Sequence, residues 1–167
     1  EQLSALGVNA LTVPEEYGGA GRDITATMVV IEELARRSMA VAVPFIMCAC
    51  YGAMNIEEVG SYEQKAELLP KLAEGKLLFA YGISEPDVGA DVASVRTTAV
   101  RKDNGATVTI NGSKRFCSGA NIADYIYTVV KSDPEAGRYK NLSIVMIPPD
   151  APGVTIELQN SMGMKGA

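Results

Sequence analysis

The chain contains 167 residues, of which 47% are apolar, and its formal net charge is −5. This length and composition suffice for a buried core in one or two domains, and the acidic balance argues against a nucleic-acid-binding surface. The chain has no histidine, which excludes Ser-His-Asp and Cys-His catalysis and the usual zinc sites, so we expect no metal centre.

The sequence carries no signal peptide, and no uninterrupted apolar segment approaches about 18 residues, so we expect no membrane insertion. Because the first residue is Glu1 and not methionine, a targeting segment could be missing. Three cysteines are typical of a reducing compartment. Cys48 and Cys50 are two residues apart and do not share a helical face, so we interpret them as small core residues.

The first 75 residues follow a helical pattern after a loop-like start. Residues 1–23 contain Pro14 and several glycines, for which a flexible lead-in is one reasonable interpretation. Residues 25–38 predict an amphipathic helix whose buried stripe consists of Met28, Ile31, Leu34 and Ala35.

Residues 41–59 form the most apolar segment, in which Pro44 predicts a helix start or a kink. Helical spacing places four residues on one face, which we interpret as ordinary core: Pro44, Met47, Cys48 and Tyr51. Ser61 is expected to begin another helix without a strict capping box, and Pro70 to interrupt it. A turn at Gly75 then ends a helical domain of residues 1–75.

Residues 76–167 predict a second domain made of strands. A buried strand at 77–83 ends in a loop, and Asp103-Asn104-Gly105 predicts a hairpin between strands at 95–101 and 107–110. Asn111-Gly112 predicts another tight turn before a short strand at Phe116 and Cys117. Further strands are expected at 125–131, 142–147 and 154–158. The fold class is therefore predicted to be α+β, with a helical domain followed by an antiparallel β-sheet or small barrel.

Three motifs occur in this order: Val13-Pro14-Glu15-Glu16-Tyr17-Gly18-Gly19, Gly82-Ile83-Ser84-Glu85 with Gly89, Asp91 and Ser94, and Asn111 to Ala120. Together they resemble the acyl-CoA dehydrogenase family, flavoenzymes that desaturate acyl thioesters between the alpha and beta carbons. The resemblance covers nearly the whole chain. It implies a truncated acyl-CoA dehydrogenase-like fold with a helical domain and most of the middle β domain. It also implies a second interpretation of residues 1–23, as a wall segment of the helical domain near the active site.

The resemblance implies FAD as the cofactor, held by eight residues: Tyr81, Ile83, Ser84, Gly89, Ala90, Phe116, Cys117 and Ser118. Free backbone N–H groups at a strand end and short hydroxyls are suited to the pyrimidine edge and N5 of a flavin. We therefore expect the two strand ends at Ser84 and Ser118 to converge and to hold one ring between them. Taken alone, each serine is more often a turn or cap residue. The resemblance also implies that Ala90, Pro44, Met47 and Tyr51 border the acyl substrate, although ordinary core is the simpler interpretation of the last three.

We interpret Glu85 and Asp91 as structural residues, because Glu85 precedes Pro86 and Asp91 occupies a place typical of a cap. The resemblance implies that the catalytic carboxylate belongs to a helical domain beyond Ala167, so we expect a fragment without catalytic residues. Val88 and Ala90 depart from the family, which usually has a small residue and a Ser or Thr there. The absent hydroxyl at Ala90 removes a potential hydrogen bond of ~1 kcal/mol to the thioester arm.

The activity implied is α,β-dehydrogenation of an acyl-CoA thioester, with electrons passed to electron-transfer flavoprotein. The family is commonly tetrameric, so we expect a dimeric or tetrameric homo-oligomer, in a bacterial cytoplasm or a mitochondrial matrix. Three alternatives remain open: an acyl-CoA oxidase, a non-catalytic partner subunit of a heteromeric acyl-CoA dehydrogenase, and an acidic binding module without a cofactor.

Overall fold

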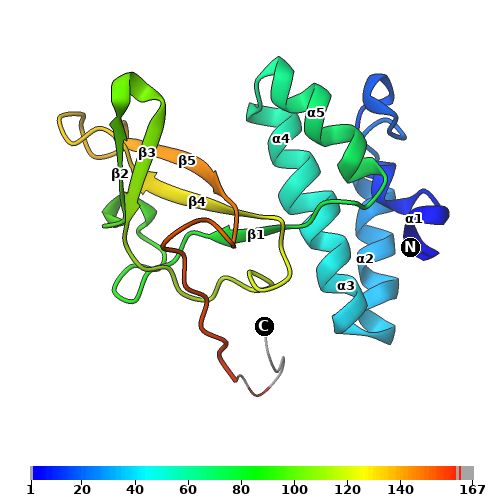
Figure 1. Ribbon diagram of the computed structural model, residues 1–167. Coiled ribbons are helices and arrows are strands. Elements are labelled where there is room, and N and C mark those ends of the chain that lie inside the picture. The colour runs from blue at the N-terminus through cyan, green and yellow to red at the C-terminus, as the bar shows by residue number, and fades with distance from the viewer. Residues whose placement is uncertain (1, 161, 163–167) are drawn as a thin grey trace. The chain divides into compact units, whose positions relative to one another are not determined.

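The computed structural model describes residues 2–160 and 162, which belong to two compact units (Figure 1). The first contains the residues up to Phe79 together with Ile122–Asp124, and the second contains Ala80–Asn121 and the residues from Tyr125 onward. Ile122–Asp124 join the first unit because the Asp124 carboxylate accepts from the Leu78 N–H at 2.8 Å and the Asp124 N–H donates to the Leu78 carbonyl at 2.9 Å.

The first unit is helical. Its α-helices are α1 (Gln2–Ala5), α2 (Ile24–Arg37), α3 (Met39–Ile46), α4 (Asn55–Val59) and α5 (Tyr62–Ala73), and a π-helix, Met47–Met54, joins α3 to α4. Its core is made of side chains that are at most 2% exposed, among them Phe45, Met47, Ile56, Leu69, Leu72 and Phe79. The burial of these large apolar groups is the main force that holds the helices together.

Of the two interpretations of residues 1–23, the flexible lead-in is wrong, because the segment is folded from Gln2 onward. It contains the short 3-10 helices Val8–Thr12 and Glu15–Tyr17. Thr12 and Val13 are fully buried, and the Thr12 hydroxyl donates to the Ala49 carbonyl at 2.8 Å. Glycine and proline in this segment provide turns, while buried side chains fix the backbone between them.

Helix α2 confirms the predicted amphipathic helix, with a displaced buried face. Asp23 caps its start, because the Asp23 carboxylate accepts from the Ala26 N–H at 2.8 Å. Thr27 is fully buried, whereas Met28 is 47% exposed. The stripe predicted through Met28 is therefore wrong at that residue, because the polar Thr27 can be buried once its hydroxyl donates to the Asp23 carbonyl at 2.7 Å.

Residues 39–59 form one continuous helical segment that includes Pro44 and the π-helix. Its length and composition are sufficient for a membrane span, and 44% of its apolar window is buried inside the protein. The prediction that no apolar segment approaches about 18 residues is therefore wrong. Ala42, Cys48 and Ala49 are buried here, as expected of a core helix.

Helix α5 corrects two expectations. A full capping box begins it, because the Gln64 N–H donates to the Ser61 hydroxyl at 3.3 Å and the Ser61 N–H donates to the Gln64 side chain at 2.9 Å. Pro70 does not interrupt the helix, which continues to Ala73. Leu68, Leu69, Leu72 and Ala73 are all buried, and this packing compensates for the hydrogen bond that proline cannot make.

The sheet contains β1 (Phe79–Gly82), β2 (Thr98–Lys102), β3 (Thr107–Asn111), β4 (Tyr125–Lys131) and β5 (Leu142–Ile147). The strand order is β1-β4-β2-β3, and β5 pairs with β4. The α+β class is confirmed. The predicted hairpin is also confirmed, because β2 and β3 pair antiparallel around Asn104 and Gly105, whose φ angles are 54° and 93°.

Three sheet predictions need correction. Strand β2 pairs with β4 in parallel at Thr98 and Lys131, so the sheet is mixed. Residues 116–117 form no strand, because they belong to a loop in which Phe116 has a φ of 60°. Residues 154–158 alternate in character but pair with no strand among the described residues. Alternation alone does not make a strand when no partner edge is available.

One face of the sheet is covered by the loop that follows β1. Val88 and Val95 from this loop pack against Val129 of β4, with Ile83, Val92 and Leu142 at the margin. Because side chains alternate along a strand, Ile126 and Thr128 of β4 point to the opposite face. The loop that carries the second motif is therefore anchored by its own apolar side chains.

Candidate functional site

Two loops meet where β1 ends. The Arg115 N–H donates to the Ser84 carbonyl oxygen at 2.8 Å, and the Lys114 ammonium donates to the Ile83 carbonyl oxygen at 3.1 Å. The segments that carry Ser84 and Ser118 are therefore neighbours. Since the Ser84 carbonyl is used within the chain, this residue can offer a ligand its amide N–H and its hydroxyl.

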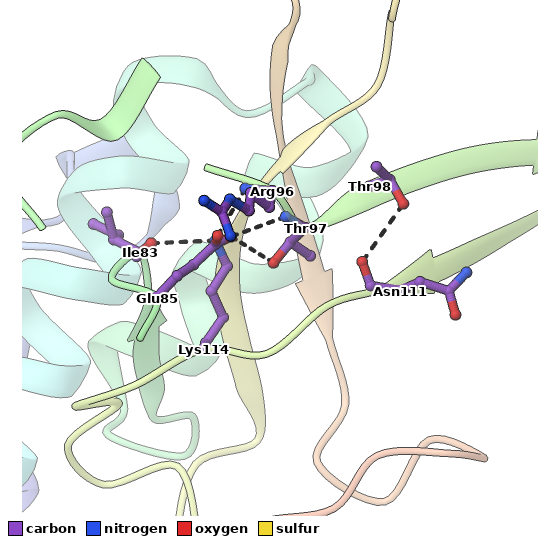
Figure 2. A network of polar contacts seen from close by, with 7 residues as sticks. All are labelled: Ile83, Glu85, Arg96, Thr97, Thr98, Asn111 and Lys114. Carbon is purple, nitrogen blue, oxygen red and sulfur yellow. Dashed lines mark hydrogen bonds and ion pairs between the residues drawn. The ribbon is translucent and has the colours of Figure 1, made fainter. Parts of the chain in front are cut away.

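Glu85 is the centre of the polar network beside this junction (Figure 2). One of its carboxylate oxygens accepts from the Thr97 N–H at 2.9 Å, the Thr97 hydroxyl at 2.6 Å and the Lys114 ammonium at 2.9 Å. The other accepts from the Arg96 N–H at 2.7 Å. Burial would raise the pKa of Glu85, but the hydrogen bonds from Thr97, Lys114 and Arg96 outweigh it and lower this pKa to about 2. Glu85 is therefore ionised at neutral pH and is unsuited to proton transfer there.

Gly112 allows the second loop to approach this network. A Cβ atom at Gly112 would lie 2.3 Å from the Thr97 hydroxyl oxygen. Gly82 is enclosed in the same way, since a Cβ there would lie 3.0 Å from the Thr128 hydroxyl oxygen. Two glycines of the motifs thus serve close packing of backbone against side chains.

These contacts agree with the interpretation of Glu85 and Asp91 as structural residues. The side-chain cap expected at Asp91 is absent. Glu85 forms a tight turn with Val88 and bridges distant segments. Asp91 precedes the 3-10 helix Val92–Ser94 without a side-chain cap. Its carboxylate instead accepts from the Ser94 hydroxyl at 2.6 Å and from the Arg138 guanidinium, and these contacts lower the pKa of Asp91.

The predicted flavin residues fall into two groups within the sheet unit. Tyr81, on β1, lies 5.9 Å from the ring of Tyr127. The partly buried Ile83 side chain packs against the Val88–Val95–Val129 cluster, and its carbonyl oxygen accepts from Lys114. Gly89 and Ala90 are exposed at the tip of the loop, and no atom lies within 4 Å of a Cβ built at Gly89.

The remaining three predicted flavin residues, Phe116, Cys117 and Ser118, belong to the second loop. They lie in an irregular segment and not at the end of a strand. Phe116 is 70% exposed, and the Arg115 guanidinium lies 4.7 Å from the centre of its ring. Cys117 is half-buried, and this burial raises the pKa of its thiol. Ser118 is exposed, and its N–H donates to the Phe116 carbonyl at 3.0 Å. The ring of Phe116 is therefore open to a planar ligand.

A cavity of about 870 Å³ lies against the sheet face opposite the apolar cluster. Its walls include Val108, Ile110, Ile126, Thr128 and Ile147 from the strands. Of the predicted flavin residues, only Phe116 and Cys117 line it. The cavity therefore adjoins the second loop but does not include Ser84. The candidate site is the hydrogen-bonded junction of the two loops.

The three substrate candidates outside the loop belong to the helical unit. Met47 is fully buried, whereas Pro44 and Tyr51 are partly exposed. The spacing that placed them on one face assumes an α-helix, but Met47 and Tyr51 belong to the π-helix, in which the angular spacing of side chains differs. The simpler interpretation as core is correct for Met47.

Sequence reasoning missed Lys114, Thr97 and Arg115. Lys114 and Arg115 stand inside the third motif, and Glu85 stands inside the second. An acidic and a basic residue at the two points where a pair of loops is expected to converge could have indicated an ion pair between them. Thr97 gave no signal of this kind, because threonine is common in strands.

Comparison with known proteins agrees with the two-part architecture. Residues 1–76 match the family model for the acyl-CoA dehydrogenase N-terminal domain, and residues 80–167 match that for the acyl-CoA dehydrogenase middle domain. An acyl-CoA dehydrogenase of Bacillus subtilis is 36% identical over 168 residues, which cover 100% of this chain and 44% of that relative. The chain therefore spans less than half of the length of this curated relative.

Solved structures show the same likeness. An acyl-CoA dehydrogenase complexed with FAD from Bacillus anthracis aligns with a TM-score of 0.85 at 31% identity, over 97% of this chain and 27% of that one. The ChsE4-ChsE5 complex from Mycobacterium tuberculosis aligns with a TM-score of 0.78 at 34% identity, over 96% of this chain and 40% of that one.

Proposed function

Because this chain belongs to the acyl-CoA dehydrogenase family, we propose that its complete gene product is an FAD-dependent acyl-CoA dehydrogenase. In this proposal the chain provides the helical and middle domains, and the catalytic base lies outside residues 1–167. The electron acceptor is electron-transfer flavoprotein, the enzyme is a dimeric or tetrameric homo-oligomer, and it works in a bacterial cytoplasm or a mitochondrial matrix.

One observation carries the proposal: the Arg115–Ser84 hydrogen bond of 2.8 Å joins the two loops assigned to the flavin. The residues there fit an isoalloxazine ring. The Ser84 amide and the hydroxyls of Ser84 and Ser118 are donors for its polar edge, and the exposed ring of Phe116 is an apolar surface for one face. FAD, when bound, supplies the hydride acceptor of the reaction.

The chain's own contribution is to bind and orient. Glu85, with its pKa lowered to about 2, stays ionised and keeps the loop in place; it does not abstract the alpha proton. Asp91 is held by Ser94 and Arg138. Asp87 pairs with Arg96 at 3.1 Å. Because all three carboxylates of this loop have partners within the chain, we assign the base to a carboxylate elsewhere in the gene product, acting while donors hold the thioester oxygen.

The test is purification of the complete gene product and measurement of its visible flavin absorbance before and after anaerobic addition of acyl-CoA thioesters. We expect a flavin band that is bleached by at least one acyl-CoA. Purified, folded protein that neither contains nor binds FAD would contradict the proposal. Electron transfer to a dye without release of peroxide would separate a dehydrogenase from an acyl-CoA oxidase.

The second candidate is a non-catalytic partner subunit. It is favoured by the likeness to the ChsE4-ChsE5 complex and by the departures at Val88 and Ala90. Val88 is 7% exposed and packs in the sheet core, which explains an apolar residue there, whereas Ala90 is exposed. Co-purification with a second, different chain that carries the acyl-CoA-reducible flavin would select this candidate.

A further inference from the structure

Two consecutive residues, Lys114 and Arg115, hold three consecutive residues of the loop after β1. The Lys114 ammonium donates to the Ile83 carbonyl oxygen at 3.1 Å and to the Glu85 carboxylate at 2.9 Å (Figure 2). Between these contacts, the Arg115 N–H donates to the Ser84 carbonyl oxygen at 2.8 Å. The backbone on both sides of Ser84 is therefore fixed from a single segment.

These contacts replace a strand ladder. Strand β1 ends at Gly82, so regular pairing with β4 does not orient residues 83–85. An irregular segment keeps one conformation only where side chains or other backbone groups satisfy its polar atoms. Lys114 satisfies the carbonyl oxygen of Ile83 and the carboxylate of Glu85 in this way.

The ammonium group has few alternative places. The Lys114 side chain is 10% exposed and the Glu85 side chain is 4% exposed. A buried ammonium is stable only when it is paired and hydrogen-bonded. Both acceptors lie on the loop after β1, and the aliphatic stem passes Gly82, where a Cβ would be 3.6 Å from Lys114 Cγ. Lys114 and the loop are thus restricted to one mutual arrangement.

We propose that Lys114 is a positioning residue, which orients the Ser84 amide and hydroxyl toward the flavin without contacting the ring. This inference rests on the proposed function. A loop released from Lys114 would present Ser84 in many orientations. Because hydrogen bonds weaken steeply when donor and acceptor are misaligned, the bonds from Ser84 to the flavin would then be weaker. The expected consequence is weaker flavin binding in a protein that still folds.

A purely structural role must be separated from this one. If Lys114 served only to neutralise Glu85, removal of both charges would restore what removal of one destroys, because replacement of a buried ion pair by neutral groups is often harmless to stability. A positioning role predicts a different result. The Ile83 carbonyl would still lack its donor, and Ser84 would remain loosely held.

The experiment compares FAD dissociation constants, and free energies of unfolding in urea, of the complete gene product and three variants. Lys114→Met is expected to raise the FAD dissociation constant at least about tenfold, as the loss of charge-assisted hydrogen bonds predicts. Glu85→Gln combined with Lys114→Met is expected to be more stable than Lys114→Met, because no unpaired charge remains buried, but not to recover FAD affinity. Arg96→Gln is the matched control, because it removes only the exposed Arg96–Asp87 ion pair on the same loop.

A readout without flavin accompanies the binding measurement. Hydrogen exchange of residues 80–90 in FAD-free protein is expected to be faster in Lys114→Met and in the double variant than in the wild type and in Arg96→Gln. Wild-type affinity in Lys114→Met, or its recovery in the double variant, would overturn the inference while leaving the proposed function intact. A folded wild type that binds no FAD would overturn the proposed function and this inference with it.

Discussion

Glu85 shows how one residue can stabilise two loops at once. Its carboxylate is almost completely buried, yet it accepts four hydrogen bonds, one of them from the Lys114 ammonium. Hydrogen bonds to the charged form favour ionisation, which is why its pKa is lowered although burial alone would raise it. The hydrogen bonds that hold the two loops together therefore also make the stability of the protein depend on pH.

The sign of this linkage follows from the pKa values. The pKa of Glu85 falls from an ordinary 4.5 to about 2 on folding, so the unfolded chain binds the proton more tightly. The stabilisation is complete above about pH 4.5 and is lost as the pH falls toward 2, with an upper limit of about 3 kcal/mol. Glu85→Gln should remove this part of the pH dependence, measured as unfolding free energy in urea at several pH values.

Glu67→Gln is the matched control, because the Glu67 side chain is 67% exposed and pairs only with Lys71 on the helix surface. It should follow the wild-type pH profile. A Glu85→Gln profile parallel to that of the wild type between pH 4.5 and 2 would show that Glu85 does not have the lowered pKa.

At the scale of elements, the π-helix Met47–Met54 is fitted to its neighbours by Gly52. A Cβ atom at Gly52 would lie 2.5 Å from Leu72 Cδ2 of α5 and 2.9 Å from Phe79 Cδ2 of β1. Both neighbours are fully buried. The absence of a side chain therefore allows the wide turn of the π-helix to pack directly on two core side chains.

Gly52→Ala should destabilise the protein by about 1–3 kcal/mol, because the added methyl group overpacks the core. The measurement is the midpoint and slope of urea unfolding followed by far-ultraviolet circular dichroism. Gly137→Ala serves as the control, since no atom lies within 4 Å of a Cβ built at Gly137. Equal stabilities of the two variants would contradict the packing described for Gly52.

At the scale of the whole chain, each compact unit has its own core. Leu69 is fully buried in the helical unit, and Val130 is fully buried in the sheet unit. Separate cores predict that local destabilisation remains within one unit, because subglobal openings follow contiguous packing.

Leu69→Ala should cost about 2–5 kcal/mol in the helical unit and increase amide hydrogen exchange in α5 and the π-helix, with little change in β4 and β5. Val130→Ala should do the reverse. Native-state hydrogen exchange resolved by peptide measures both. An increase of similar size in both units for either variant would mean that the chain opens as one cooperative body.

Local patterns in the sequence predicted the elements whose signals lie within a few residues. The hairpin at Asn104-Gly105 formed because those residues adopt positive φ, and α2 formed because its apolar spacing and Asp23 both favour a helix. The α+β class followed from the change between these two periodicities. Capping by Ser61 was expected for the same local reason, although the box with Gln64 was not.

Tertiary packing decided the rest, because its partners are distant in sequence. Glu85 and Lys114 are 29 residues apart, and nothing in either local pattern states that a carboxylate and an ammonium will share one buried place. The same reason explains why the strands predicted at 116–117 and 154–158 do not form. Alternation supplies a suitable side-chain pattern, but a strand also needs a neighbouring strand edge with which to pair. The motifs and the family resemblance led to the expectation that the two loops converge. Only the tertiary structure decided which contacts join them, because the hydrogen bonds from Lys114 and Arg115 to residues 83–85 are long-range and form only in the folded chain.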